Sequence, residues 1–297
     1  MISLLNALPG AAAQGLIWGI MAIGVYITYR VLDIADLTVD GSLCTGGAVC
    51  IMLMLGGHNV WVGMLGGMLA GMVAGFATGI LHTFMGIPAI LAGILTQLGL
   101  YSINLKVMGK ANQAINVDKY DLLVSLRFIK NVPLYKNTIL LVALLIAAVI
   151  LILYWFFGTE LGCSLRATGC NDKMARAQGI NTDFSRVLGL MISNGIVAFS
   201  GALLSQYQGF ADINMGRGAI VIGLAAVIIG EAVFGRIFRN FGFRLLGVVF
   251  GSIIYYLVLQ VVIWMGIDTD LLKLLSAVVV AIFLAIPTWK SRYLTKG

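Results

Sequence analysis

Residues 138–157 read TILLVALLIAAVILILYWFF, a run without a single charged side chain. A helix of about 20 apolar residues crosses the hydrocarbon core of a bilayer, because its backbone polar groups pair within the helix. Comparable runs recur along the whole chain. Of its 297 residues 60% are hydrophobic and 10% charged, whereas soluble domains carry about 25% charged residues. The sequence therefore predicts an integral membrane protein and not a soluble enzyme.

The same criterion predicts an all-α, polytopic bundle of about nine spans that form one transmembrane domain over residues 1–297. The expected spans are 5–29, 42–56, 61–82, 88–107, 138–157, 184–207, 218–235, 245–266 and 271–288. An odd number of spans puts the termini on opposite sides. The basic tail after residue 289 favours a cytoplasmic C-terminus and an outside N-terminus. The loop 108–137 weakens this orientation, because it would lie outside and is also basic.

The net charge of +7 comes from basic residues between the apolar runs. Cytoplasmic loops and anionic lipid headgroups explain them better than nucleic acid does. The cysteines, Cys44, Cys50, Cys163 and Cys170, fit neither a zinc ribbon nor an extracellular disulfide framework, so free thiols are expected. The two histidines are isolated, and no metal site is predicted.

Glycines recur at every fourth position of the third expected span, at Gly67, Gly71, Gly75 and Gly79. They form a helix face without side chains, which allows another helix to approach closely. The surrounding string GGMLAGMVAGFATG, 66–79, is no nucleotide-binding loop, because no strand precedes it.

The polar stretch ELGCSLRATGCNDKMARAQGIN, 160–181, separates two apolar runs. Asn171 or Asp172 is typical of a helix N-terminus, and Gly179 of the left-handed residue beyond a helix end. We expect a helix of about two turns, roughly 12 Å long, on the cytoplasmic surface. Its outward face would carry Lys173, Arg176 and Gln178, with Met174 and Ala177 against the membrane domain. The alternative is a basic loop that only follows the positive-inside rule.

Glu231 lies well inside an expected span. Burying its charge there would cost about 3 kcal/mol, which makes an intramembrane carboxylate a candidate functional group. The alternative is a position near the cytoplasmic end, where Glu231 would pair with Arg236 or Arg239.

Other polar side chains fall within or between the spans. Gln97, Tyr101 and Asn104 share one face of the fourth span, where they line a solute pathway or bond neighbouring helices. Asn194 in the sixth span, with Ser193 and Gln206, leaves the same two possibilities open. Asp33, Asp36 and Asp40 flank the break after the first span, where Thr38 and Asp40 would cap a broken helix and where a pathway role is plausible. The stretch 120–130 mixes charge with apolar residues and is either an interfacial helix or an ordinary loop.

The string LRATGCNDKMARAQGIN, 165–181, resembles the cytoplasmic coupling segment of permease subunits in ATP-binding-cassette importers of the branched-chain amino acid and ribose class. The resemblance extends to IADLTVDGSL at 34–43, FSGALLSQYQGFADINMGRG at 199–218 and GLAAVIIGEAVFG at 223–235. It implies that 158–183 is the coupling segment, and that the ATPase is engaged through Arg166, Gly169, Asn171, Lys173, Arg176 and Gly179.

The resemblance also implies an assembly in the cell membrane. It would contain two permease chains, expected to form a homodimer, a cytoplasmic ATPase and an extracytoplasmic substrate-binding protein. The sequence has no Walker motif, so ATP is expected to be used by the partner, and no cofactor is expected on this chain. DLTVDGS at 36–42 and GEAVFG at 230–235 are similar to a subgroup linked to tryptophan or tyrosine.

The predicted function is passage of a small neutral or zwitterionic solute, since little fixed charge lies in the spans. The candidate pathway residues are Asp40, Gln97, Asn104, Asn194 and Glu231. The alternative is an ion-coupled secondary transporter that uses Glu231.

Overall fold

The computed structural model describes residues 2–117, 120, 122–129, 137–235, 237, 238, 240–265, 274, 277, 278, 280–282 and 285. The helices are α1 (Ile2–Tyr26), α2 (Val39–Leu55), α3 (Val60–Thr83), α4 (Ala89–Met108), α5 (Thr138–Phe156), α6 (Glu160–Cys170), α7 (Asp172–Ala177), α8 (Thr182–Gln208), α9 (Ala219–Phe234) and α10 (Phe241–Trp264). The π-helical turn η1 (Ile27–Val31) and the 3₁₀ turn η2 (Leu126–Ile129) complete the helical elements, and β1 (Asn112–Ala114) pairs antiparallel with β2 (Phe210–Asp212).

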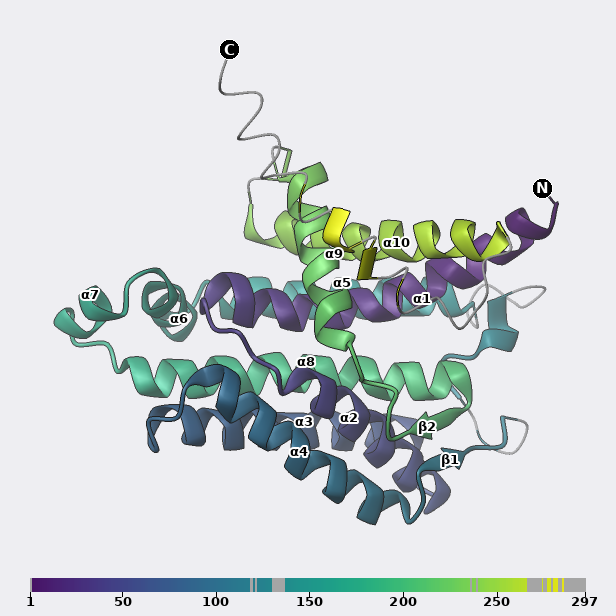
Figure 1. The fold of residues 1–297 in the computed structure, drawn as a ribbon, viewed down its shortest axis with the longest axis horizontal. Coiled ribbons are helices and arrows are strands. Elements are labelled where there is room, and N and C mark those ends of the chain that lie inside the picture. Colours follow the sequence, from purple (N-terminus) through teal and green to yellow (C-terminus); the bar gives the residue numbers. More distant parts are fainter. Residues whose placement is uncertain are drawn as a thin grey trace.

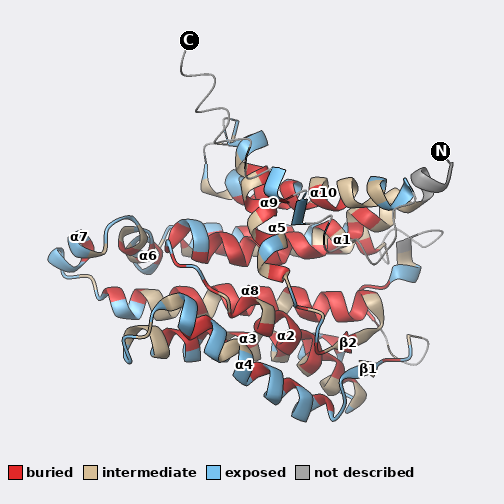
Figure 2. Cartoon of the chain, in the orientation of Figure 1, coloured by how far each residue is buried: buried red, intermediate tan, exposed pale blue. Residues whose placement is uncertain are grey.

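The helices α1 and α8 form the centre of the bundle (Figure 1). Most of their residues are buried, whereas in α4 and α5 fewer than a third are buried, which places these two helices at the periphery. Figure 2 shows this contrast between α8 and α4 directly. The small helices α6 and α7 lie at one end of the long helices, and β1 and β2 lie at the other end (Figure 1). The two ends of the bundle therefore carry different accessory structures.

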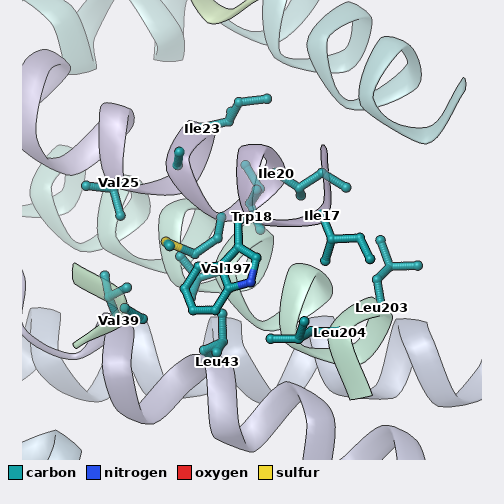
Figure 3. Packing of buried hydrophobic residues seen from close by; sticks show 14 of the residues in the cluster. Ile17, Trp18, Ile20, Ile23, Val25, Val39, Leu43, Val197, Leu203 and Leu204 are labelled. Atoms are coloured by element: carbon teal, nitrogen blue, oxygen red, sulfur yellow. The ribbon is translucent and has the colours of Figure 1, made fainter. Parts of the chain in front are cut away.

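Aliphatic side chains from α1, α2 and α8 interlock in the core. Figure 3 draws Ile17, Ile20 and Ile23 of α1, Leu43 of α2 and Val197 of α8, which belong to one core cluster. The isoleucines and Val197 are at most 5% exposed. Because lipid is as apolar as these side chains, close packing and interhelical hydrogen bonds must hold the helices together.

Six helices are long and apolar enough to cross a membrane: α1 continued by η1, α3, α4, α5, α8 and α10. Two further expected spans are shorter helices, because α2 has 17 residues and α9 has 16. At 1.5 Å per residue each is about 25 Å long, which is less than the ~30 Å hydrocarbon core. The prediction of about nine spans, some of them short, is therefore confirmed in part, because six helices are long enough to cross and the runs 42–56 and 218–235 form shorter helices. The ninth, 271–288, lies largely outside the described residues.

The described part of 120–130 forms no interfacial helix. Its main helical feature is the short turn η2. Leu122 and Val124 are buried in the core of the bundle, where they join the side chains of the long helices. The stretch is a connecting loop that contributes apolar side chains to the interior.

The four glycines at four-residue spacing face other helices. A Cβ at Gly67 would lie 2.8 Å from the carbonyl oxygen of Gly46 in α2. Gly71 and Gly75 lie against the α8 backbone at Asn194 and Leu190. Gly79 meets Val187 further along the same helix. The glycine face of α3 thus passes from α2 to α8, and at each of the four positions a Cβ would lie within 3.0 Å of a backbone atom of the facing helix.

We expect Gly71→Leu to destabilise the protein, because the new side chain would overlap Ala198 and the carbonyl of Asn194. Overpacking of this kind costs about 1–3 kcal/mol or more. Thermal unfolding in detergent should show a Tm several degrees lower. The matched control is Gly99→Leu on α4, where nothing lies within 4 Å of a Cβ. Equal Tm values for the two variants would contradict close packing of α3 on α8.

Candidate functional site

The chain leaves helical geometry between α1 and α2. After η1, residues 32–38 return from the end of α1 into the bundle, where Figure 1 draws them as a purple trace that ends at α2. Asp33 has φ +55°, a left-handed conformation that Asp tolerates better than most residues. Non-helical backbone within a membrane protein must be buried against protein or line a cavity. This break is buried against α8 and α3 by the hydrogen bonds described next, and against α4 at Gly93, where a Cβ would lie 2.8 Å from the backbone N of Leu37.

A hydrogen-bond network fixes the break to three other helices. The backbone N–H of Thr38 donates to Asp36 Oδ1 over 2.9 Å, and Asn194 Nδ2 donates to Asp36 Oδ2 over 2.7 Å. Ser42 donates to Asn194 Oδ1 over 2.6 Å. Thr38 and Thr78 share a hydroxyl hydrogen bond of 2.7 Å. Asn194 is fully buried in this network, so its contacts agree with interhelical bonding.

Asp40 caps the N-terminus of α9. Its Oδ2 accepts the N–H of Gly218 and its Oδ1 accepts the N–H of Ile220, both over 2.9 Å. A carboxylate here satisfies two of the free N–H groups at a helix start and complements the helix dipole. The expectation that Thr38 and Asp40 cap the broken helix itself is therefore corrected. Asp36 caps α2 at Thr38, whose own side chain makes no cap bond, and Asp40 reaches across to α9.

A polar cavity of about 120 Å³ lies between α2, α4 and the segment that joins β2 to α9. Its lining residues are Asp40, Gly41, Cys44, Gln97, Leu98, Tyr101, Asn104, Ile213 and Arg217. Three of the five candidate pathway residues, Asp40, Gln97 and Asn104, thus line one space. Within the described residues, no hydrogen bond joins Gln97, Tyr101 or Asn104 to another helix, which favours the pathway interpretation of this face.

Glu231 lies outside the cavity lined by Asp40, Gln97 and Asn104. Arg30 Nε donates to its Oε1 over 2.9 Å, and the two side chains are 57% and 31% exposed. Glu231 is therefore a half-buried member of an ion pair at the α6 end of α1. The expected partners Arg236 and Arg239 lie outside the described residues, whereas Arg30 pairs with Glu231 from 201 residues away in the sequence. Neither residue lines the cavity around Asn104.

The segment 158–183 contains two short helices, α6 and α7, where the sequence predicts one. Each helix start has a side-chain cap. Thr159 accepts from Gly162 N at the start of α6, Asn171 from Met174 N at the start of α7, and Asn181 from Phe184 N at the start of α8. Gly179 has φ +83° and ends α7 as predicted. These caps define a helix–turn–helix that leads directly into α8.

Arg176 binds within this segment. Its guanidinium donates to Asp183 over 2.8 Å and to Thr182 over 2.7 Å, and it lies 3.7 Å from Asp172. These contacts tie α7 to the first turn of α8. The predicted inward face is wrong, because Ala175 is the buried residue of α7, whereas Met174 and Ala177 are exposed. Lys173 is exposed as expected.

Two residues of α6 connect the segment to the break after α1. A Cβ at Gly169 would overlap the carbonyl of Val31, so this glycine allows α6 to rest directly on η1. The guanidinium of Arg166 lies 4.7 Å from the ring centre of Phe241 and 5.4 Å from that of Phe157, within range of cation–π attraction. A movement of α6 would therefore displace its contact residues in η1 and in the first turn of α10.

Arg217 and Cys44 line the cavity but are not among the pathway residues that the sequence predicts. A signal for Arg217 exists, because it is the only basic residue between Arg186 and Arg236. Cys44 gives no such signal. Its thiol donates to Ile213 O over 3.3 Å and accepts from Gly216 N over 3.2 Å, contacts that depend on the fold.

Comparison with known proteins places this geometry in context. Residues 8–286 match the family model described as "Branched-chain amino acid transport system / permease component". The chain is 37% identical over 281 residues to a tyrosine transport system permease protein of Clostridioides difficile (strain R20291), with 95% of this chain and 91% of that protein covered. It is 35% identical over 289 residues to an uncharacterized protein of Rickettsia prowazekii (strain Madrid E), with 95% and 98% covered.

A solved structure titled "PsaBC from Streptococcus pneumoniae in complex with Fab" superposes with a TM-score of 0.55 over 99% of both chains, at 18% identity. This likeness concerns the fold alone. The family match covers most of the chain, and the described helices supply the multiple spans that a permease needs. The chain therefore belongs to the family of permease components of branched-chain amino acid transport systems, membrane-embedded subunits of ATP-binding-cassette importers.

Proposed function

We propose that this permease passes a small zwitterionic solute, an aromatic amino acid such as tyrosine or tryptophan, across the cytoplasmic membrane. The observation that carries the proposal is the cavity lined by Asp40, Gln97 and Asn104, which offers hydrogen-bonding groups within a predominantly apolar bundle. The relative from Clostridioides difficile, named a tyrosine transport system permease, supports an aromatic substrate. One carboxylate and one guanidinium in the lining suit a solute without net charge.

The segment formed by α6 and α7 transmits movement of the ATPase. It is short, capped at both helix starts and fixed to α8 through Arg176. Gly169 brings it into contact with η1, and η1 carries Arg30, the partner of Glu231 on α9. A push on α6 or α7 by a docked ATPase would therefore act on the ends of α1, α8 and α9 together.

The proposed topology has nine spans with the N-terminus outside and the C-terminus in the cytoplasm. α6 and α7 lie at the opposite end of α1 from β1 and β2 (Figure 1). If α6 and α7 face the cytoplasm, α1 runs from outside to inside. The proposed partners are a cytoplasmic ATPase that uses the ATP, an extracytoplasmic substrate-binding protein, and a second permease chain in a homodimer.

An ion-coupled secondary transporter that uses Glu231 is less well supported. A carboxylate that exchanges protons or sodium across the membrane needs access from both sides, whereas Glu231 is held by Arg30 at one end of α1. Asp36 and Asp40 are occupied by backbone and amide donors. Asp36, Asp40 and Glu231 are therefore engaged in holding helices.

We expect Glu231→Gln to retain ATP-driven uptake of the same order as the unmodified protein, because the amide oxygen of glutamine can still accept from Arg30 Nε and the lost charge of a partly exposed pair is worth only about 0.2–1 kcal/mol. The measurement is amino acid uptake by proteoliposomes that contain the ATPase and the binding protein. Glu160→Gln, on the surface of α6, serves as the control. Loss of uptake in Glu231→Gln but not in Glu231→Asp, together with dependence on an imposed proton gradient, would favour the secondary transporter.

Gly169→Val should uncouple the importer, since the new side chain would collide with Val31 and displace α6 from η1. Substrate-stimulated ATP hydrolysis should fall about tenfold or more, in the range of typical coupling energies. Arg176→Ala should act in the same direction by releasing α7 from Asp183. Cys163→Ala, at an exposed position of α6, is the control.

Labelling of Cys170 tests the topology, because its thiol is exposed next to Gly169. A membrane-impermeant maleimide should label Cys170 in inside-out vesicles only. Labelling of Cys170 on intact cells would place α6 outside and refute the docking of the ATPase on this segment.

The substrate is tested on the binding protein encoded beside the permease gene, because in importers of this kind the binding protein sets the affinity. Calorimetric titration should give tight binding of tyrosine or tryptophan and none of ribose or a nucleoside. Tight binding of a sugar, with no response to aromatic amino acids, would refute the aromatic substrate and leave the permease function intact.

A further inference from the structure

We propose that the cavity between α2, α4 and residues 213–217 is a binding site for the ammonium and carboxylate groups of the transported amino acid. In this site Arg217 contacts the carboxylate, and Asn104 and Asp40 contact the ammonium group. The proposal rests on the proposed function and adds a solute site within the permease itself.

An unpaired polar atom lies in the wall of the cavity. Asn104 is 1% exposed, and its Oδ1 is buried without a hydrogen-bond partner in the described structure. A buried polar atom is almost always paired, because leaving it unpaired costs its full desolvation energy. Asn104 lines the cavity, so a ligand in that space can supply the missing donor. An ammonium group has three N–H donors and is suited to this position.

The lining of the cavity carries one negative and one positive side chain. Asp40 provides a carboxylate and Arg217 a guanidinium, and no other charged residue lines the cavity. Arg217 is exposed, and no ion pair links it to a carboxylate in the part of the chain that the structure describes. Each carboxylate oxygen of Asp40 accepts one backbone N–H and has capacity for a second donor. A zwitterion therefore finds one group of opposite charge for each of its own.

The walls of the cavity are held in place by close helix contact and by backbone hydrogen bonds. A Cβ at Gly41 would lie 2.9 Å from Leu100 and 3.2 Å from the Cα of Gln97, so α2 and α4 touch beside the cavity. Asp40 is held by two backbone donors and Cys44 by two backbone partners. The polar groups around the cavity thus have fixed positions, which favours recognition of a defined head group.

The mouth of the cavity suits an aromatic side chain. Tyr101 and Leu98 line the cavity and are 44% and 64% exposed. With the head group beside Asn104, the ring of the solute would extend toward Tyr101. Aromatic rings attract each other in offset or edge-to-face arrangements. The cavity itself, at about 120 Å³, is small, so the ring would remain at its mouth.

Cys44 offers a direct measurement of occupancy, because it lines the cavity, whereas Cys50 is buried on the same helix outside it. The full-length permease in nanodiscs is treated with N-ethylmaleimide, and the modification of each cysteine is followed by mass spectrometry. Tryptophan should slow the modification of Cys44 without affecting Cys50. Tryptophan amide, which lacks the carboxylate, should protect about tenfold less well, since it loses a charge-assisted contact.

Two substitutions test the assigned contacts. Asn104→Leu should remove protection by tryptophan, whereas Ser102→Ala, on the exposed side of α4, should keep it. Arg217→Gln changes an exposed residue, which leaves the core intact, and should abolish the difference between tryptophan and its amide. Absence of Cys44 protection in the unmodified protein, or equal protection in Asn104→Leu, Arg217→Gln and Ser102→Ala, would overturn the proposal.

The outcome is separable from that of the proposed function. If ATP-driven tryptophan uptake occurs while Cys44 is never protected, the importer function stands and the site is refuted. If the binding protein takes only a sugar and that sugar protects Cys44, the zwitterion site and the aromatic substrate are both refuted.

Discussion

Two carboxylates hold helix N-termini inside the bundle, and the rest of the structure depends on them. A bilayer provides no water to pair free backbone N–H groups, so a chain that stops being helical at depth needs internal acceptors. Asp36 supplies one at Thr38, and Asp40 supplies two at the start of α9. These bonds permit α2 and α9 to be shorter than a full span. The same interruption creates room for the cavity beside Asp40.

Close helix contact makes the interruption stable. The glycine face of α3 lies against α8, and Gly46 and Gly201 bring α2 and α8 into backbone contact at Ala198 and Leu43. Such proximity places Asn194 within reach of both Asp36 and Ser42. In lipid, where apolar contact with another helix gains little over contact with acyl chains, packing of this kind and hydrogen bonds provide the adhesion. The buried hydrogen bonds of Asn194 therefore depend on the close helix approach that the glycines allow.

The sequence predicts the helical class and the positions of the apolar runs well, because hydropathy reports directly on the bilayer. It also predicts the caps at Asn171 and Gly179, since these are local features. It does not show whether the short runs 42–56 and 218–235 cross the bilayer completely, because hydropathy does not distinguish a helix that starts at depth from one that spans the membrane. Contacts between distant segments leave no periodic signal in the sequence. Arg30 and Glu231 are 201 residues apart, and Asp40 and Gly218 are 178 residues apart. Arg217 illustrates the same limit, because its place beside Asn104 depends on the folded path after β2.

The contacts of α9 indicate how the two ends of the molecule communicate. Its first turn is held by Asp40 in the cavity wall, and Glu231 near its last turn is held by Arg30 on η1. The turn η1 in turn supports α6 through Val31 and Gly169. A displacement of α6 would therefore pass to η1 through the contact of Gly169 with Val31, and from η1 to α9 through the ion pair of Arg30 with Glu231. The short helix α9 then connects this ion pair to the cavity wall at Asp40. The 16 residues of α9 form one continuous α-helix, so a displacement of its last turn would pass along the helix to the bonds with Asp40. The cap that stabilises the resting fold is thus also the point at which coupling would alter the solute site.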